Sequence, residues 1–167
     1  DLIRSRGLGD VYKRQEYVTK QMSENLILNY YGETYERRPL MYAVLSSKNN
    51  IKDIEEIRLS NLEVLNDKPK SINNKAIVWL SYSVHGNESS STEASMQTLY
   101  YLLTKNYDLL ENTIVIIDPC LNPDGRDRYA NWYNQVRTMP YTSDKISKEH
   151  SEPWPGGRAN HYLFDLN

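Results

Sequence analysis

The chain has 167 residues, with 20 Lys and Arg, 22 Asp and Glu, 3 His and one Cys, and its formal net charge is −2. This length corresponds to one domain or to part of a larger one. The near-zero charge argues against a nucleic-acid-binding module, the single cysteine excludes an internal disulfide framework, and no apolar run is long enough for a membrane-spanning helix.

The first fifteen residues show no apolar repeat of 2 or 3.6 residues, so no helix or strand is predicted there. The segment also lacks the long apolar stretch of a signal peptide. We interpret residues 1–15 as a non-native or disordered segment and residues 16–167 as the body of the domain. The cellular location is not indicated by this sequence.

Two β-rich runs, residues 26–31 and 39–45, flank a short polar connection and predict an antiparallel hairpin. Ile and Leu then recur every three to four residues over 53–65, which predicts an amphipathic helix. Residues 66–74 are polar and are expected to form a loop.

Residues 76–80 (AIVWL) form a continuous apolar run that is typical of a strand covered on both faces. A helix is predicted next, with Ser90 and Glu93 as a capping box at its start. Residues 113–117 (TIVII) predict a second buried strand, and the strand–helix–strand order implies a parallel pair. After Asn122, Pro and Gly interrupt every pattern, so we expect a long functional loop.

Together these elements predict an α/β fold with a mixed, mainly parallel sheet, flanking helices and an N-terminal antiparallel hairpin. Ligands of such sheets bind beyond the carboxyl ends of the strands. The first buried strand is followed by His-Gly-Asn-Glu at residues 85–88, and the second by Asn-Pro-Asp-Gly at residues 122–125. Both motifs are therefore expected to face the ligand.

His85 and Glu88 lie three residues apart where a strand turns into a helix, a spacing that can direct both side chains to one point. An imidazole nitrogen and a carboxylate oxygen both bind Zn²⁺ at about 2.0–2.2 Å. We therefore predict that His85 and Glu88 are metal ligands. The alternative is a surface histidine beside a glutamate that caps the helix.

Three blocks occur in order: HGNE at 85–88, NPDG at 122–125 and GRANHYLFDLN at 157–167. Together they resemble the zinc metallocarboxypeptidases of the carboxypeptidase A and B type, and residues 32–40 resemble the hairpin before their first metal motif. The resemblance covers about residues 17–167. It implies a zinc-dependent peptidase that removes C-terminal residues from peptides, with this chain as an incomplete, N-terminal part of the catalytic domain.

The resemblance also implies roles for single residues. His85 and Glu88 correspond to the first two zinc ligands, and Asn167 corresponds to the residue that holds the terminal carboxylate of the peptide. Arg137 stands where the family carries the arginine that polarises the scissile carbonyl. The third ligand, a histidine, and the catalytic glutamate lie further along the family's sequence, so these 167 residues alone are expected to be inactive.

Other residues are open to competing interpretations. Arg126 and Arg128 are close rivals of Arg137, and Asn87 stands where better-known family members carry an arginine. His150 and His161 are interpreted as loop histidines and Cys120 as a core residue. Asp118 and Asp124 are interpreted as turn formers beside Pro and Gly.

Two other functions remain open. A zinc-dependent deacylase of N-acyl amino acids shares the HGNE and DLN motifs, and the chain could instead be an inactive fragment or a binding remnant. The NPDG motif and the Tyr- and Trp-rich segment after it favour the peptidase. The expected partner is a peptide substrate, with no nucleic acid and no membrane span, and the oligomeric state is not predicted.

Overall fold

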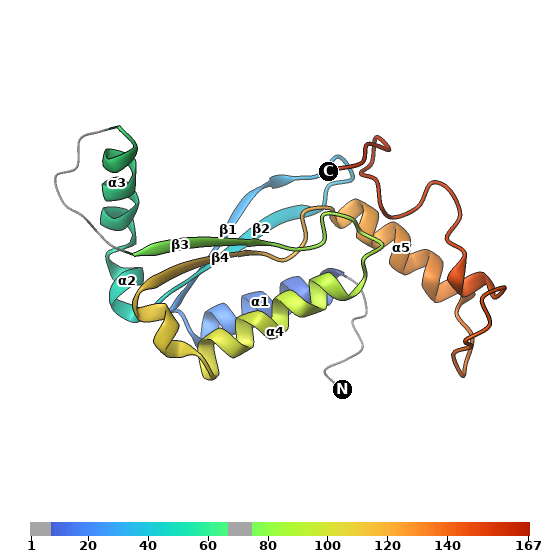
Figure 1. Ribbon diagram of the computed structural model, residues 1–167, viewed down its shortest axis with the longest axis horizontal. Coiled ribbons are helices and arrows are strands. Elements are labelled where there is room, and N and C mark those ends of the chain that lie inside the picture. Colours follow the sequence, from blue (N-terminus) through green and yellow to red (C-terminus); the bar gives the residue numbers. More distant parts are fainter. Residues whose placement is uncertain (1–7, 67–74) are drawn as a thin grey trace.

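One four-stranded sheet forms the centre of the molecule in the computed structural model, which describes residues 8–66 and 75–167 (Figure 1). Its strands lie in the order β1-β2-β4-β3, and the ranges are β1 Leu26–Glu33, β2 Pro39–Leu45, β3 Ala76–Ser81 and β4 Thr113–Asp118. β2 pairs antiparallel with β1 and with β4, whereas β3 pairs parallel with β4. The mixed α/β fold and the N-terminal hairpin are thus confirmed.

The helices pack on the sheet or extend from its ends. They are α1 (Leu8–Gln21), α2 (Lys48–Lys52), α3 (Ile54–Leu65), α4 (Ser90–Thr104) and α5 (Pro123–Val136), with short 3-10 turns η1 (Tyr107–Glu111) and η2 (Lys148–His150). α1 and α4 lie side by side under one face of the sheet, while α5 runs outward from the carboxyl ends of β3 and β4 (Figure 1). The predicted loop at 66–74 lies almost wholly outside the described residues. In the described part of the chain, no helix has the length and apolarity needed to cross a membrane.

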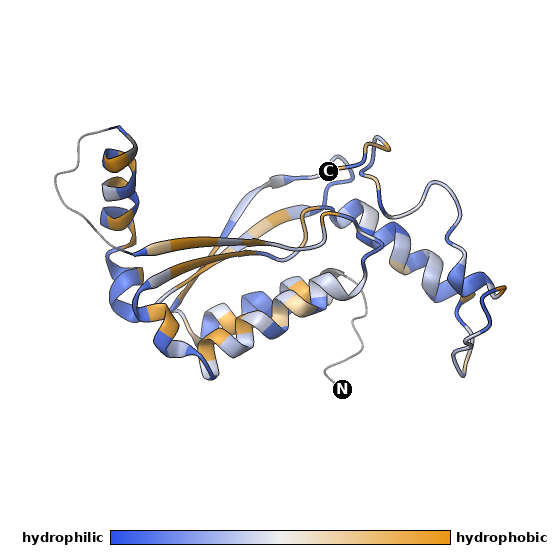
Figure 2. Ribbon diagram, in the orientation of Figure 1, coloured by the Kyte–Doolittle hydropathy of each residue, from blue (hydrophilic) through white to orange (hydrophobic). Residues whose placement is uncertain are grey.

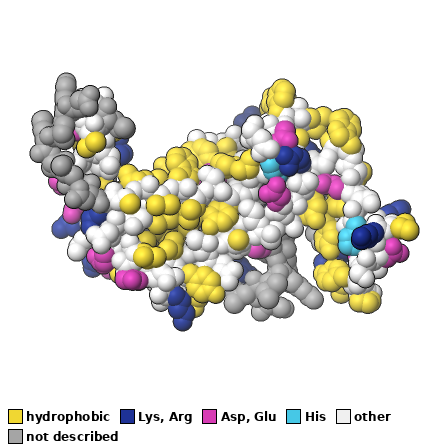
Figure 3. All heavy atoms as spheres, in the orientation of Figure 1, with side chains coloured by type: hydrophobic (Ala, Val, Ile, Leu, Met, Phe, Trp, Pro, Cys, Tyr) yellow, Lys and Arg dark blue, Asp and Glu magenta, His cyan; other side chains and the backbone are white. Residues whose placement is uncertain are grey.

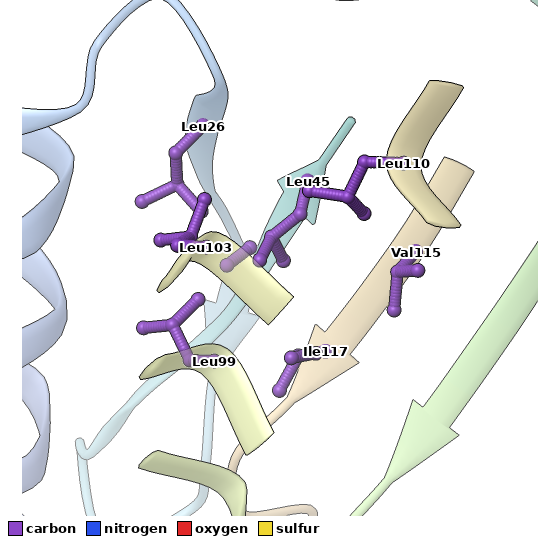
Figure 4. Packing of buried hydrophobic residues seen from close by; sticks show 8 residues of the cluster. Leu26, Leu45, Leu99, Leu103, Leu110, Val115 and Ile117 are labelled. Carbon is purple, nitrogen blue, oxygen red and sulfur yellow. The ribbon is translucent and has the colours of Figure 1, made fainter. Parts of the chain in front are cut away.

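The main core lies between the sheet and helices α1 and α4. Side chains alternate along β2 and β4 so that every second residue faces inward, and Leu99 and Leu103 stand four residues apart on the inner face of α4. Each buried aliphatic side chain contributes roughly 1.5–3 kcal/mol. The cluster, shown in Figure 4, consists of Leu26, Ala43, Leu45, Leu99, Leu103, Leu110, Val115 and Ile117.

The prediction that residues 76–80 are covered on both faces is wrong. β3 is the last strand in the sheet order, and Trp79 is 60% exposed. Ile77 and Val78 are exposed as well. The ribbon of β3 is strongly apolar (Figure 2), and hydrophobic side chains gather on the face of the molecule where it runs (Figure 3). The described helices therefore leave this apolar strand largely uncovered.

The N-terminal helix corrects a second expectation. The sequence pattern predicts no regular structure before residue 16, but residues 8–15 belong to α1. Val11, Tyr12 and Gln15 are buried, and the Tyr12 hydroxyl donates a hydrogen bond to the carbonyl oxygen of Pro39 at 2.9 Å. Only two of these three buried side chains are apolar and the third is the polar Gln15, so no apolar repeat indicated the helix in the sequence. A domain boundary at residue 15 stays a prediction.

The segment after β4 is a helix rather than the start of a loop. The Asn122 side chain accepts a hydrogen bond from the backbone N–H of Gly125 at 2.9 Å, and Pro123 occupies the first turn of α5. An asparagine cap followed by proline favours the start of a helix. The irregular loop begins only after Val136.

The predicted capping box of the preceding helix is also wrong. α4 begins at Ser90 with Ser89 as its N-cap, and the Ser89 side chain forms no capping hydrogen bond. Glu93 instead accepts a hydrogen bond from Arg126 at 2.9 Å, and this ion pair links the first turns of α4 and α5. Glu93 thus pairs with a residue of α5 instead of capping its own helix.

Candidate functional site

The three sequence blocks meet beyond the carboxyl ends of β3 and β4. The backbone of Gly86 lies directly against α5, since a Cβ atom added there would come within 2.0 Å of the Arg126 nitrogen and 2.1 Å of the Gly125 carbonyl carbon. A Cβ added to Gly157 would similarly lie 2.5 Å from the Gly125 oxygen. Only glycine permits such close backbone approaches. The blocks HGNE, NPDG and GRANHYLFDLN therefore form one site.

Side chains of the second block anchor the third. Asn122 Nδ2 donates to the backbone oxygens of Arg158 at 3.1 Å and Ala159 at 3.2 Å. Arg128 Nη1 donates to the carbonyl of Gly156 at 2.9 Å. These bonds fix the backbone of residues 156–159 beside the start of α5, and they give Arg128 a structural role.

His85 lies at the centre of the site, with each ring nitrogen facing a carboxylate. Its Nδ1 is 2.8 Å from Glu88 Oε1, and its Nε2 is 3.0 Å from Asp165 Oδ1. His85 is only 7% exposed, whereas the side chains of Glu88 and Asp165 are 61% and 48% exposed. The imidazole is therefore held firmly, while Glu88 opens to the solvent.

The donor chemistry of this arrangement fits a metal ion. An ionised carboxylate only accepts hydrogen bonds, so a neutral ring that donates Nε2–H to Asp165 turns the Nδ1 lone pair toward Glu88. Two acceptor atoms that lie 2.8 Å apart are stabilised by a cation between them, and both atoms are common zinc ligands. Asp165, on the opposite nitrogen, has the position of a carboxylate that orients a metal-binding histidine.

A guanidinium also lies at this point. Arg158 Nη1 is 3.2 Å from His85 Nδ1 and 4.0 Å from Glu88 Oε1, and Arg158 Nε donates to Asp165 Oδ2 at 2.7 Å. The hydrogen bond from Arg158 lowers the pKa of the Asp165 carboxyl below its ordinary value. Arg158 was missed in the sequence, although it belongs to the third block and precedes Asp165 by seven residues.

The structure does not bring Arg137 to this point. Arg137 is exposed and caps the end of α5, eleven residues after Arg126, which corresponds to about 16 Å along a helix. Arg126 is buried in its ion pair with Glu93. Asn167 is near the centre, because its backbone N–H donates to Asp165 Oδ1 at 3.3 Å.

A second cluster of possible ligands occurs at the tip of the β1–β2 hairpin. Single ligand atoms of Glu36, Asp124 and His161 lie within 4.8 Å of one another. Arg38 Nη1 already contacts Glu36 at 2.5 Å and Asp124 at 2.7 Å, and the ring of Tyr35 stacks on His161. This cluster is best described as an ion-pair network that fastens the hairpin to α5 and to the C-terminal segment.

The surroundings of Cys120 and Asp118 indicate that both residues stabilise the fold. Cys120 is buried, and burial raises the pKa of its thiol to about 11, so little reactive thiolate forms. Asp118 accepts hydrogen bonds from the Tyr31 hydroxyl at 2.7 Å and from the Cys120 backbone at 3.1 Å. Burial raises the pKa of the Asp118 carboxyl above its ordinary value. Its two hydrogen bonds fix the backbone at the C-terminal end of β4.

The fold and the site define an α/β protein whose His–Glu pair suits a metal ion at the carboxyl ends of parallel strands. The family model described as zinc carboxypeptidase matches residues 12–167, and the chain therefore belongs to the zinc carboxypeptidase family. A search of curated proteins gives no match to this chain.

Several solved structures share the fold. Carboxypeptidase A from Helicoverpa armigera is 17% identical with a TM-score of 0.62, over 87% of this chain and 32% of its own. Thrombin activatable fibrinolysis inhibitor is 19% identical with a TM-score of 0.57, over 77% of this chain and 28% of its own. The bovine thrombin-activatable fibrinolysis inhibitor, in complex with tick carboxypeptidase inhibitor, is 17% identical with a TM-score of 0.57, over 95% of this chain and 48% of its own. The chain thus spans less than half of each of these structures.

Proposed function

We propose that this chain is the N-terminal part of the catalytic domain of a zinc-dependent metallocarboxypeptidase, which removes C-terminal residues from peptides. Family membership supports the hydrolase class. The observation that carries the proposal is the placement of His85, with Nδ1 at 2.8 Å from Glu88 and Nε2 at 3.0 Å from Asp165.

In this proposal His85 Nδ1 and the Glu88 carboxylate hold the zinc ion, which when bound supplies a Lewis acid for the peptide carbonyl. Asp165 keeps the imidazole in the orientation and tautomer that the metal requires. Asn167, two residues after Asp165, binds the terminal carboxylate of the peptide. The 48% exposure of Asp165 and 61% exposure of Glu88 leave this centre open to a substrate.

Catalytic zinc usually has three protein ligands and one open position, and this centre supplies two ligands. The proposal therefore includes a third ligand and a catalytic base from sequence that follows residue 167. We expect residues 1–167 alone to show no peptidase activity. Hydrolysis of a peptide by these residues, abolished by a zinc chelator, would contradict this expectation.

The ligand assignment is tested by zinc content in the full-length protein. We expect one zinc ion per chain in the wild type, loss of that ion in a combined His85→Ala and Glu88→Ala variant, and full retention in a control, His150→Ala. His150 is an exposed histidine of η2. Zinc that persists in the double variant would overturn the assignment.

The reaction class is tested separately, by the rates of the zinc-loaded full-length protein on a peptide and on an N-acyl amino acid. The proposal expects faster hydrolysis of the peptide at its C-terminal bond. Faster hydrolysis of the N-acyl amino acid would replace the carboxypeptidase by the deacylase while leaving the zinc site intact.

A further inference from the structure

The Glu152 carboxylate connects the HGNE motif to the segment that leads into the third block. Its Oε2 accepts a hydrogen bond from Asn87 Nδ2 at 2.9 Å, and its Oε1 accepts one from the backbone N–H of Gly157. Asn87 and Glu152 are both half-buried, and they lie 65 residues apart in the chain. The bond between their side chains, the Asn87–Glu152 bridge, is therefore a tertiary contact beside the metal centre.

Two adjacent glycines shape the place where this carboxylate lies. A Cβ atom added to Gly156 would lie 2.9 Å from the carboxylate carbon of Glu152. A Cβ added to Gly157 would lie 2.5 Å from the Gly125 carbonyl oxygen and 3.3 Å from the backbone nitrogen of Asn87. The lack of a side chain at both positions lets the backbone close around the carboxylate. The bridge is thus part of the packing between the two segments.

Asn87 stands between the two candidate zinc ligands in a tight turn. The backbone N–H of Glu88 donates to the carbonyl oxygen of His85 at 3.2 Å, which closes the turn over residues 85–88. The Glu88 side chain is 61% exposed, so its position depends strongly on the backbone that carries it. Because Asn87 directly precedes Glu88, a bond that fixes Asn87 limits the movement of Glu88 away from His85. Groups that orient metal ligands in this way affect the affinity for the metal.

Contact with the substrate is the competing role for Asn87, since better-known members of the family carry an arginine at this position. An arginine is a long cation with a fork of donors, whereas asparagine is a short neutral donor. The Asn87 amide nitrogen already bonds to Glu152 at 2.9 Å. The short amide therefore matches the nearby carboxylate, and the geometry favours the bridge.

We propose that Asn87 and Glu152 are positioning residues of the zinc site. Their bridge holds the turn over residues 85–88 in the conformation that directs His85 Nδ1 and the Glu88 carboxylate to the same ion. This role rests on the proposed function, and neither Asn87 nor Glu152 binds the ion or the peptide. A turn that is ordered before zinc arrives loses less conformational freedom on binding, so the bridge raises the affinity for zinc.

The test reverses donor and acceptor across the bridge in the full-length protein. Asn87→Asp places a second carboxylate opposite Glu152, and like charges at this distance repel. Glu152→Ala removes the acceptor. A reversed pair, Asn87→Asp combined with Glu152→Gln, restores the bond, because the new amide donates to the new carboxylate and still accepts from the Gly157 N–H. Glu55→Ala is the matched control, since Glu55 is an exposed glutamate of α3 that pairs with Arg58.

Three quantities are measured: the zinc dissociation constant of the folded protein by chelator competition, the unfolding midpoint of the zinc-free protein in urea, and KM for a peptide at saturating zinc. We expect Asn87→Asp and Glu152→Ala each to weaken zinc binding by roughly 10- to 100-fold, as loss of an outer partner of a metal ligand does. The reversed pair should recover most of this loss, and Glu55→Ala should match the wild type. Because Asn87 does not contact the peptide, KM at saturating zinc should not change.

Four results would overturn the positioning role. Zinc affinity could stay unchanged in both Asn87→Asp and Glu152→Ala, or the reversed pair could bind zinc no better than Asn87→Asp. A raised KM in Asn87→Asp with wild-type zinc affinity would make Asn87 a substrate contact. A lower unfolding midpoint in Glu152→Ala with wild-type zinc affinity would show that the bridge only supports the fold.

Two further outcomes separate this role from other causes. If Asn87→Asp does not fold, the zinc affinities of Glu152→Ala and of the reversed pair decide by the same criteria. A wild type that binds no zinc would overturn the proposed function as well. Zinc bound by His85 and Glu88 in the wild type, with unaffected variants, would overturn the role of the bridge alone.

Discussion

The close packing of Gly86 on α5 leads to a sharp prediction about Gly86→Ala. The new Cβ atom would lie 2.0 Å from the Arg126 nitrogen, whereas ordinary contact begins at 3.4 Å, so the shortfall is 1.4 Å. The backbone nitrogen of Arg126 and the carbonyl carbon of Gly125, the two nearest atoms, both belong to the backbone, so rotation of a side chain cannot relieve the clash. The HGNE loop or the start of α5 must therefore move by more than an ångström.

The expected cost follows from this displacement. Overpacking of a well-packed region costs about 1–3 kcal/mol, and a clash of backbone on backbone belongs at the upper end, so we expect a loss of about 3 kcal/mol. The same movement separates His85 from Asp165, which belongs to the third block. Zinc affinity should therefore fall together with stability.

Gly32→Ala is the matched control for this change. Nothing lies within 4 Å of a Cβ added at Gly32, which stands in the exposed half of β1. Because glycine weakens strand interiors, we expect stability to stay constant or rise by up to about 1 kcal/mol. Urea unfolding of both variants measures the difference. Equal unfolding midpoints for Gly86→Ala and Gly32→Ala would refute the close packing of the two motifs.

Three further predictions concern single side chains. Asp165→Asn should weaken zinc binding by roughly 10- to 100-fold, measured by chelator competition, and an unchanged affinity would contradict the orienting role of Asp165. Cys120 should resist iodoacetamide at pH 8 until the chain unfolds, because burial raises its thiol pKa to about 11, and rapid labelling of the folded protein would refute this. Glu149 accepts a hydrogen bond from the Thr138 backbone at 2.6 Å, which lowers the pKa of Glu149 from 4.5. The stabilisation of the fold by the ionised Glu149 is therefore complete at neutral pH and is lost as the pH falls through the lowered pKa. The NMR chemical shift of the Thr138 amide should titrate with a midpoint below 4.5. A midpoint at or above that value would contradict the hydrogen bond.

The elements that depend on local pattern could be predicted from the sequence. The apolar runs of β2 and β4 and the three-to-four spacing of α3 form strands and a helix where the sequence places them, and β4 is largely buried. The proximity of His85 and Glu88 was also predictable, because three residues at a strand-to-helix junction allow both side chains to converge.

Features decided by tertiary contacts were not predictable in the same way. The start of α5 is the exception, because its Asn122 cap and Pro123 are local signals that the turn-like composition of Pro-Asp-Gly concealed. The exposure of β3 depends on its place in the sheet order, which the apolar run AIVWL does not encode. Arg158 reaches the centre only because Gly157 and Asn122 fix a segment far along the chain.

The position of zinc in the full-length protein tests the central claim most directly. Anomalous diffraction at the zinc edge, from crystals of the zinc-loaded protein, would locate the ion without reference to activity. The account predicts one strong peak bonded to His85 Nδ1 and to the Glu88 carboxylate, with Asp165 on His85 Nε2. A peak among Glu36, Asp124 and His161, with none at His85, would contradict it.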